Sequence, residues 1–178
     1  MRLLQEKNNY MNIFKNKYSN PQPAIPDAIW QNPLYFIAFG FGSGALPFAP
    51  GTWGTLMAIP FYLVLQFLPL GIYTIVTVAV IIGSIWLCDK ITREIKVHDH
   101  PGMCLDEIVG FLVTMIGAPY GFKWIVIGFL LFRLFDIWKP QPIRYIDEKV
   151  GGGLGIILDD VVAGIFACAL LHILAWVF

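Results

Sequence analysis

The sequence has few charged residues for its length. Only 13% of its 178 residues are charged, and 12 basic and 12 acidic side chains cancel to a formal net charge of zero. A soluble domain usually has about a quarter of its residues charged. Without an excess of basic residues, there is no electrostatic footprint for nucleic acid, and we expect no such partner. Low charge combined with 57% hydrophobic residues predicts an integral membrane protein instead.

Cysteine is scarce as well. Cys88, Cys104 and Cys168 are widely spaced and odd in number, which fits neither a disulfide framework nor a zinc site. The first twenty residues lack the apolar core of a signal peptide. We therefore predict a polar cytoplasmic tail over residues 1–32 and one integral membrane domain over residues 33–178.

The apolar runs predict an all-α, polytopic membrane protein with about five membrane helices. Lys and Arg gather in the N-terminal tail, in the loop after residue 88 and in the loop after residue 138, and such loops face the cytoplasm. The expected crossings are roughly 54–69, 71–88, 107–118, 121–138 and 157–178. Before them, residues 33–55 are rich in glycine and proline, which predicts a re-entrant or interfacial segment.

Under this topology, several carboxylates lie at one depth, at the cytoplasmic ends of three helices. They are Asp106, Glu107, Asp136, Asp159 and Asp160. Charges near hydrocarbon are costly, so they need compensation. Oxygen ligands suit a hard divalent cation, and Mg²⁺ in particular commonly bridges carboxylates and phosphates. A plainer interpretation stays open, in which the first and last acidic pairs are helix N-terminal charges or caps.

Basic and small residues accompany these carboxylates. On a helix, Arg133, Asp136 and Lys139 would share a face, and with Arg144 they can meet a phosphate. The glycine-rich loop 151–155 offers backbone N–H donors. Acidic ligands for a metal beside basic groups for a phosphate predict phosphoryl chemistry on a lipid. An interfacial ion pair and a plain loop remain the alternatives.

Two further groups are weaker candidates. Ser43 and Thr52 provide hydroxyls in the glycine- and proline-rich segment, where a helix starting near Thr55 would offer its N-terminal donors to an anion. The run His98-Asp99-His100 has the residue types of a metal or general-base site, but a solvated loop is the favoured interpretation.

Four ordered blocks resemble the phosphatidylglycerophosphatase A family of bacterial membrane lipid phosphatases. Over about residues 32–175 the blocks read NPLYFIAFGFGSGALPFAPGTWGTL, VHDHPGMCLDEIVG, FRLFDIWKPQPIRYID and GGLGIILDDVVAG. The resemblance implies a Mg²⁺-dependent phosphatase that converts phosphatidylglycerophosphate to phosphatidylglycerol in phospholipid biosynthesis. It also implies a multi-pass protein of the bacterial inner membrane, with its active site facing the cytoplasm among membrane lipids.

The resemblance further implies that the five carboxylates named above belong to the active site. Asp106, Asp136, Asp159 and Asp160 are then the expected metal ligands, with Glu107 a ligand or general base. Lys139, Arg144, Thr52 and Ser43 are expected to bind the phosphate or headgroup, with Arg133 beside them.

One alternative belongs to another class of protein, a carboxylate-lined ion or proton-coupled transporter. Transporter sites usually lie near the bilayer midplane with access from both sides. The expected clustering of charge at one face favours the enzyme. Oligomeric state stays open.

Overall fold

The described part of the chain is helical throughout. The computed structural model describes residues 26–97 and 100–178, which contain helices and no strand, so the all-α prediction is confirmed. Residues 1–25 of the predicted tail lie outside the described residues. The elements are η1 (Asp27–Trp30), α2 (Pro33–Ala38), η2 (Ser43–Ala45), α3 (Pro50–Leu65), α4 (Leu70–Ile95), α5 (Leu105–Thr114), α6 (Phe122–Trp138), α7 (Ile143–Lys149) and α8 (Gly152–Val177).

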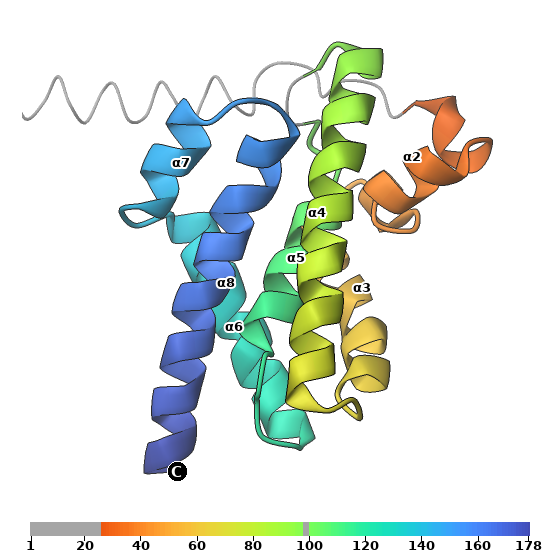
Figure 1. Ribbon diagram of the computed structural model, residues 1–178. Helices are drawn as coiled ribbons and strands as arrows, with labels where there is room; N and C mark the ends of the chain where they lie inside the picture. The colour runs from red at the N-terminus through yellow and green to blue at the C-terminus, as the bar shows by residue number, and fades with distance from the viewer. Residues whose placement is uncertain (1–25, 98–99) are drawn as a thin grey trace, which may run out of the picture.

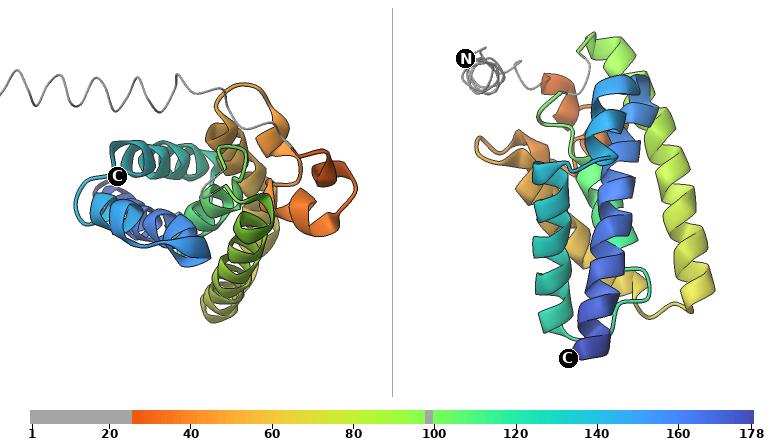
Figure 2. Two further views of the ribbon diagram at one scale, coloured as in Figure 1. Left: turned by 90° about the horizontal axis from the view of Figure 1, so that it is seen from above. Right: turned by 90° about the vertical axis from the view of Figure 1, so that its left-hand side faces the viewer.

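Helices α3, α4, α5, α6 and α8 alternate in direction and form one bundle, in which the other four pack around α5 (Figure 1). Viewed along the bundle, α5 lies in the middle, and it contacts α3, α4, α6 and α8 (Figure 2). The alternation brings the N-terminal ends of α3, α5 and α8 and the C-terminal ends of α4 and α6 toward the same end of the bundle (Figure 1). This agrees with the direction expected for each segment from the sequence.

The prediction of about five membrane helices is not confirmed. Among the described residues, only α4 and α8 are long and apolar enough to cross a membrane. Helix α5 has 10 residues, about 15 Å of rise, which is half the thickness of a hydrocarbon core. Because the residues from Ile108 to Thr114 are all buried, α5 is the core of the bundle, shielded by its neighbours.

The polar residues after Cys88 continue α4, where the sequence predicted a loop. Helix α4 runs to Ile95 and is supported by two i,i+4 ion pairs, Asp89 with Arg93 at 2.8 Å and Lys90 with Glu94 at 4.0 Å. Such spacing stabilises helices on exposed surfaces. A polar sequence therefore marks where α4 leaves the apolar region but does not end the helix.

The predicted basic loop 139–157 was also partly wrong, because it contains α7 and the first turns of α8. The glycines serve the packing of α8 against α4: a methyl group on Gly153 would collide with the Ile85 carbonyl and the Asp89 backbone. The Gly153 N–H also donates to Asp89 Oδ1 at 3.4 Å. Small residues here permit close contact between helices, as is usual in membrane bundles.

The glycine- and proline-rich segment 33–55 forms short helices followed by the start of α3. Ala49 adopts a left-handed conformation with φ of 48°, and Pro50 then opens α3. Proline fits the first helical turn because its missing N–H would be unpaired there. Tyr35 of α2 donates to Glu94 Oε2 at 3.0 Å, which attaches this segment to the polar end of α4.

Large apolar side chains cover much of the outside of the bundle. Ile75 and Ile82 of α4 are 70% and 64% exposed, and Leu130 of α6 is 60% exposed. Soluble monomers rarely expose apolar surface on this scale. With two helices long enough to span, this exterior is consistent with a protein that lies in a lipid bilayer.

Candidate active site

Two glycines bring α5 and α8 together and so place their acidic residues. A methyl group on Gly110 would lie 2.8 Å from the Asp160 carbonyl oxygen, and one on Gly164 would lie 2.5 Å from the Gly110 carbonyl oxygen. Asp106 precedes Gly110 by four residues, and Asp160 precedes Gly164 by four. Residues four apart share a helix face, so the crossing directs both carboxylates to the same place.

Asp106, Glu107 and Asp160 form a carboxylate cluster at this crossing. One oxygen from each lies within 4.8 Å of the others. Asp160 is 3% exposed, and Glu107 Oε2 is buried without a hydrogen-bond partner among residues 26–97 and 100–178. Buried carboxylates at this separation repel each other unless a cation joins them. The spacing and the oxygen ligands therefore fit a divalent ion such as Mg²⁺.

Asp159 and Asp160 are not an N-cap pair. The N-cap of α8 is Gly151, and both acidic residues lie inside the helix, where they are buried. Asp159 is seven residues past Gly152, about 10 Å along the axis. The acidic site is thus recessed below the end of α8, whereas Asp106 and Glu107 do occupy the first turn of α5, as the plainer interpretation also expected.

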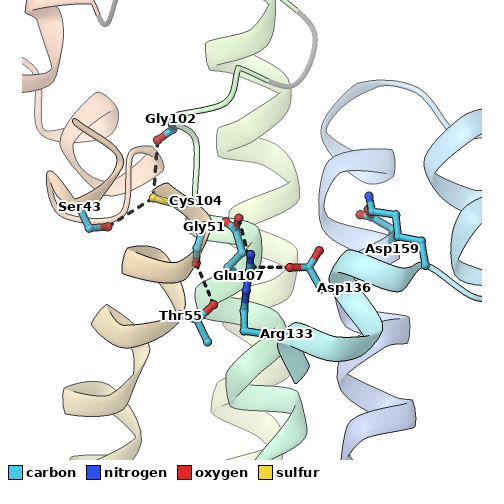
Figure 3. Close-up of polar contacts among 10 residues, drawn as sticks. Ser43, Gly51, Thr55, Gly102, Cys104, Glu107, Arg133, Asp136 and Asp159 are labelled. Atoms are coloured by element: carbon cyan, nitrogen blue, oxygen red, sulfur yellow. Dashed lines mark hydrogen bonds and ion pairs between the residues drawn. The ribbon is translucent and has the colours of Figure 1, made fainter. Parts of the chain in front are cut away.

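Arg133 connects the cluster to α6. Its Nη1 donates to Asp136 Oδ2 and lies 3.8 Å from Glu107 Oε1 (Figure 3). The three side chains are only 14–16% exposed. Arginine keeps its charge in such surroundings, and one guanidinium between two carboxylates offsets part of their repulsion. The Arg133–Asp136 pair predicted from helical spacing is present in the structure.

The first turn of α3 lies directly against this group. Gly51 has no room for a side chain, because a methyl group there would collide with Glu107 Oε1 and lie 3.1 Å from Arg133 Nη1. Thr52, a predicted phosphate ligand, is half-buried in the same turn. The predicted helix N-terminus is therefore beside the acidic cluster, although α3 begins at Pro50 and not near Thr55.

Lys139, directly after α6, pairs with carboxylates of α7 and α8. Its Nζ lies 2.7 Å from Asp159 Oδ2 and 2.7 Å from Asp147 Oδ1, so one ammonium joins α7 to α8. Burial lowers the pKa of Lys139, but the two carboxylates raise it by more, and the net pKa lies above its ordinary value. Lys139 therefore remains a cation, as a phosphate-binding or carboxylate-binding role requires.

Other predicted residues lie in different surroundings. Ser43 is buried, and its Oγ donates to the Gly40 carbonyl at 2.7 Å. The same oxygen lies 3.4 Å from Cys104 Sγ (Figure 3). Arg144 is exposed on α7, where its Nε donates to Glu148 Oε1 at 2.9 Å. These contacts do not test a role in substrate binding, which stays a prediction for both residues.

The histidine run is only partly described, because His98 and Asp99 lie outside the described residues. His100 is buried, its Nδ1 accepts from the Gly102 N–H at 3.0 Å, and its ring packs against Phe39 at 5.2 Å. The favoured interpretation of a solvated loop is therefore wrong for His100, whose contacts shape the turn before α5.

Sequence reasoning missed Asp147 and the structural glycines. Asp147 looked like one charge among several in a loop, and only the folded chain brings it to Lys139. Gly51, Gly110 and Gly164 lie within the recognised sequence blocks, but their role depends on which backbone approaches each of them.

A helical bundle with an apolar exterior and a recessed cluster of acidic and basic side chains fits the class of membrane proteins with an internal ionic site. The comparisons with known proteins define the particular family. The model of the family described as Phosphatidylglycerophosphatase A matches residues 36–175, and the chain belongs to this family.

Two curated relatives support the assignment over most of their length. The chain is 42% identical over 142 residues to Phosphatidylglycerophosphatase A of Escherichia coli K12, covering 79% of this chain and 83% of the relative. It is 44% identical over 138 residues to the Haemophilus influenzae protein of the same name, covering 76% and 85%. No solved structure matches the chain significantly. The family expected from the four sequence blocks is therefore confirmed.

Proposed function

We propose that this protein is a phosphoric monoester hydrolase that removes the terminal phosphate of phosphatidylglycerophosphate, which yields phosphatidylglycerol for phospholipid biosynthesis. Its family and the names of its relatives support this activity. The observation that carries the proposal within the structure is the recessed cluster of Asp106, Glu107 and Asp160 next to Arg133 and the first turn of α3. Acidic and basic groups side by side can serve a cation and a phosphate together.

We propose Mg²⁺ as the cofactor, held by Asp106, Glu107 and Asp160. Asp136, which shares Arg133 with Glu107, and Asp159, next to Asp160 in α8, are proposed as further ligands, although they lie outside this group of three. The close approach of the three carboxylates and the unpaired Glu107 Oε2 support this donor set. When bound, Mg²⁺ neutralises charge on phosphoryl oxygens and lowers the pKa of a coordinated water.

The chain's own basic groups are proposed to bind the phosphate. The side chain of Arg133 is 16% exposed, and its buried Nε makes no hydrogen bond within the described ranges, so this N–H is among the guanidinium donors left for an anion. The first turn of α3 adds partial positive charge at the same place, and Thr52 adds a hydroxyl. Asp136, hydrogen-bonded to Arg133, orients the guanidinium.

The general base is the alternative proposed role for Glu107, because an oxygen that binds the ion cannot also take a proton. Glu107 is the member of the carboxylate cluster that lies beside Arg133, and its Oε2 has no hydrogen-bond partner within the described ranges. If Asp106 and Asp160 hold the ion without it, this oxygen is left to take a proton from an attacking water. Access of bulk solvent is limited, since Leu105 and Ile108 on either side of the acidic pair are buried, while Asp106 and Glu107 are half-buried. A water held there is therefore close to both the base and the bound phosphate.

We further propose a multi-pass protein of the bacterial inner membrane with the site at its cytoplasmic end. The basic residues of α7 and of the C-terminal end of α4 support this orientation, because short basic segments remain in the cytoplasm. The apolar exterior and the two long helices support a bilayer location. The recessed acidic cluster would then lie near the headgroups of the inner leaflet.

The transporter alternative receives no support. The curated relatives of this chain are named as phosphatases. The described acidic cluster lies toward one end of the bundle, by the first turn of α5, and the geometry gives no reason to expect access from the other end.

Phosphate release by the purified protein tests the proposal. Phosphatidylglycerophosphate is compared with phosphatidic acid and soluble glycerol phosphate, each with and without Mg²⁺. We expect Mg²⁺-dependent release with a clear preference for phosphatidylglycerophosphate. Equal release from all three substrates would contradict the proposed specificity. No release from phosphatidylglycerophosphate would contradict the proposed activity.

A further inference from the structure

Lys139 is held between two carboxylates from different helices. It ends α6 in a left-handed backbone conformation with φ of 45°, and its Nζ lies 2.7 Å from both Asp147 Oδ1 and Asp159 Oδ2. Lysine has a long, flexible stem and a point charge without directional preference. A second carboxylate therefore restricts the ammonium to one position, which a single partner would leave less defined.

The two oxygens of Asp159 are in different situations. Oδ2 accepts from Lys139, whereas Oδ1 is buried without a hydrogen-bond partner among the described residues. Asp159 as a whole is 6% exposed. By fixing Oδ2, Lys139 fixes the rotation of the carboxylate and leaves Oδ1 for a ligand.

Asp147 differs from Asp159 in its surroundings. Its side chain is 33% exposed, and it comes from the short helix α7, which connects α6 to α8. Within the described ranges, Asp147 contacts the site through Lys139. The neighbouring carboxylate, Glu148, instead pairs with Arg144 in an exposed i,i+4 pair of the same helix.

We propose that Asp147 is a positioning residue, which holds the Lys139 ammonium against Asp159 and so keeps the Asp159 carboxylate oriented for the reaction. This inference rests on the proposed phosphatase function. It assigns Lys139 to the orientation of a carboxylate, in addition to any contact with phosphate. It also gives α7 a role in the site, although α7 carries no residue of the acidic cluster.

A purely structural role for Asp147 makes a different prediction. If the Lys139–Asp147 pair only attaches α7 to the bundle, its loss lowers the melting temperature and leaves the turnover of the folded protein unchanged. If Asp147 acts through Lys139, its loss lowers kcat only while Lys139 is present. The two roles are therefore separated by a double-mutant cycle.

The experiment compares wild type, Asp147→Asn, Lys139→Met and the double variant. Rates of phosphate release from phosphatidylglycerophosphate in detergent micelles with Mg²⁺ give kcat and KM, and melting temperatures are recorded in parallel. We expect Asp147→Asn to lower kcat about tenfold, a size typical of groups that orient a ligand residue. We expect the same substitution to change kcat less than about twofold in the Lys139→Met background.

Two further variants act as controls. Glu148→Gln removes the adjacent carboxylate of α7 and should leave kcat within about twofold of wild type. Asp147→Glu keeps the charge and should recover most of the kcat lost in Asp147→Asn, because a longer carboxylate can still reach Lys139.

Each outcome decides the inference. Wild-type kcat in Asp147→Asn, or an equal loss in both backgrounds, would overturn the positioning role while the proposed function stands. Absence of phosphate release by the wild-type protein would overturn the proposed function and this inference with it.

Discussion

Gly110 and Gly164 meet backbone to backbone where α5 crosses α8, since a methyl group on Gly164 would lie 2.5 Å from the Gly110 carbonyl oxygen. This contact sets the distance between the two helices that carry the acidic cluster. Thr114 supports the same crossing, donating to the Gly110 carbonyl at 2.9 Å with the Gly164 carbonyl 3.5 Å away. The geometry of the site therefore depends on residues that have no side chain.

Alanine at either glycine should separate the helices. We expect Gly110→Ala and Gly164→Ala each to lower the free energy of unfolding by about 1–3 kcal/mol, the usual cost of overpacking. Thermal melting in detergent measures the loss. Gly83→Ala is the matched control, because a methyl group there meets nothing within 4 Å, and it should be neutral or stabilising by up to about 1 kcal/mol. Equal effects at Gly83 and Gly164 would contradict the close-contact explanation.

Loss of charge at Asp136 or Asp159 should remove activity. We expect Asp136→Asn and Asp159→Asn each to lower kcat at least about 10²-fold while the protein still inserts in the membrane, because groups that stabilise charge in the transition state have effects of this size. Asp27→Asn, at an exposed position of η1, should retain activity. Near-normal turnover by either site variant would argue against its place in the active site.

Removal of the metal should stop the reaction and change stability. We expect EDTA to abolish phosphate release and Mg²⁺ to restore it. At a hundred times its Kd, Mg²⁺ should also raise the free energy of unfolding of the wild-type protein by about 2.7 kcal/mol. The melting temperature should rise accordingly.

Asp160→Asn tests whether Mg²⁺ acts on activity and on melting temperature through the same site. It should be inactive and lose the Mg²⁺-dependent rise in melting temperature. Without Mg²⁺ it should be as stable as wild type or more so, because one of three crowded charges is gone. An unchanged response to Mg²⁺ in this variant would remove Asp160 from the donor set.

Loss of Arg133 should destabilise the site. Arg133→Gln leaves Glu107 and Asp136 without their shared cation. We expect the free energy of unfolding to fall by an amount between about 1 kcal/mol, the value for an exposed pair, and about 3–5 kcal/mol, the value for a buried one. A second substitution, Asp136→Asn, should recover part of the melting temperature, because it removes one of the two unpaired charges. No recovery in the double variant would show that the pair is not coupled.

Lys123 tests the orientation of α6. It lies at the N-terminal end of this helix, over the ring of Trp124, and is 16 residues from Lys139, or about 24 Å along the axis. Lys123→Ala should therefore change kcat by less than about twofold. A large loss of turnover would mean that the site lies at the opposite end of the bundle from the one described.

Much of this architecture was predictable from residue patterns. The boundaries of α6 were predicted within one residue, because Gly121 and Lys139 mark its ends clearly. The start of α8 was predicted five residues late, since the glycines at 151–155 resemble a loop and serve instead as a close contact with α4. Helix α7 was missed because its seven residues, IRYIDEK, lie between prolines and glycines and are too few to give a clear periodic signal.

The sequence by itself determined the membrane-like composition, the helical class, the family and the set of acidic residues. These follow from local properties: apolar runs, charge spacing and ordered motifs. Only the tertiary structure decided that Asp160 joins Asp106 and Glu107, and that Lys139 joins Asp147 to Asp159. The reason is that the rotation and approach of each helix depend on contacts between distant backbones, such as the one at Gly110 and Gly164, which periodicity along one helix does not encode.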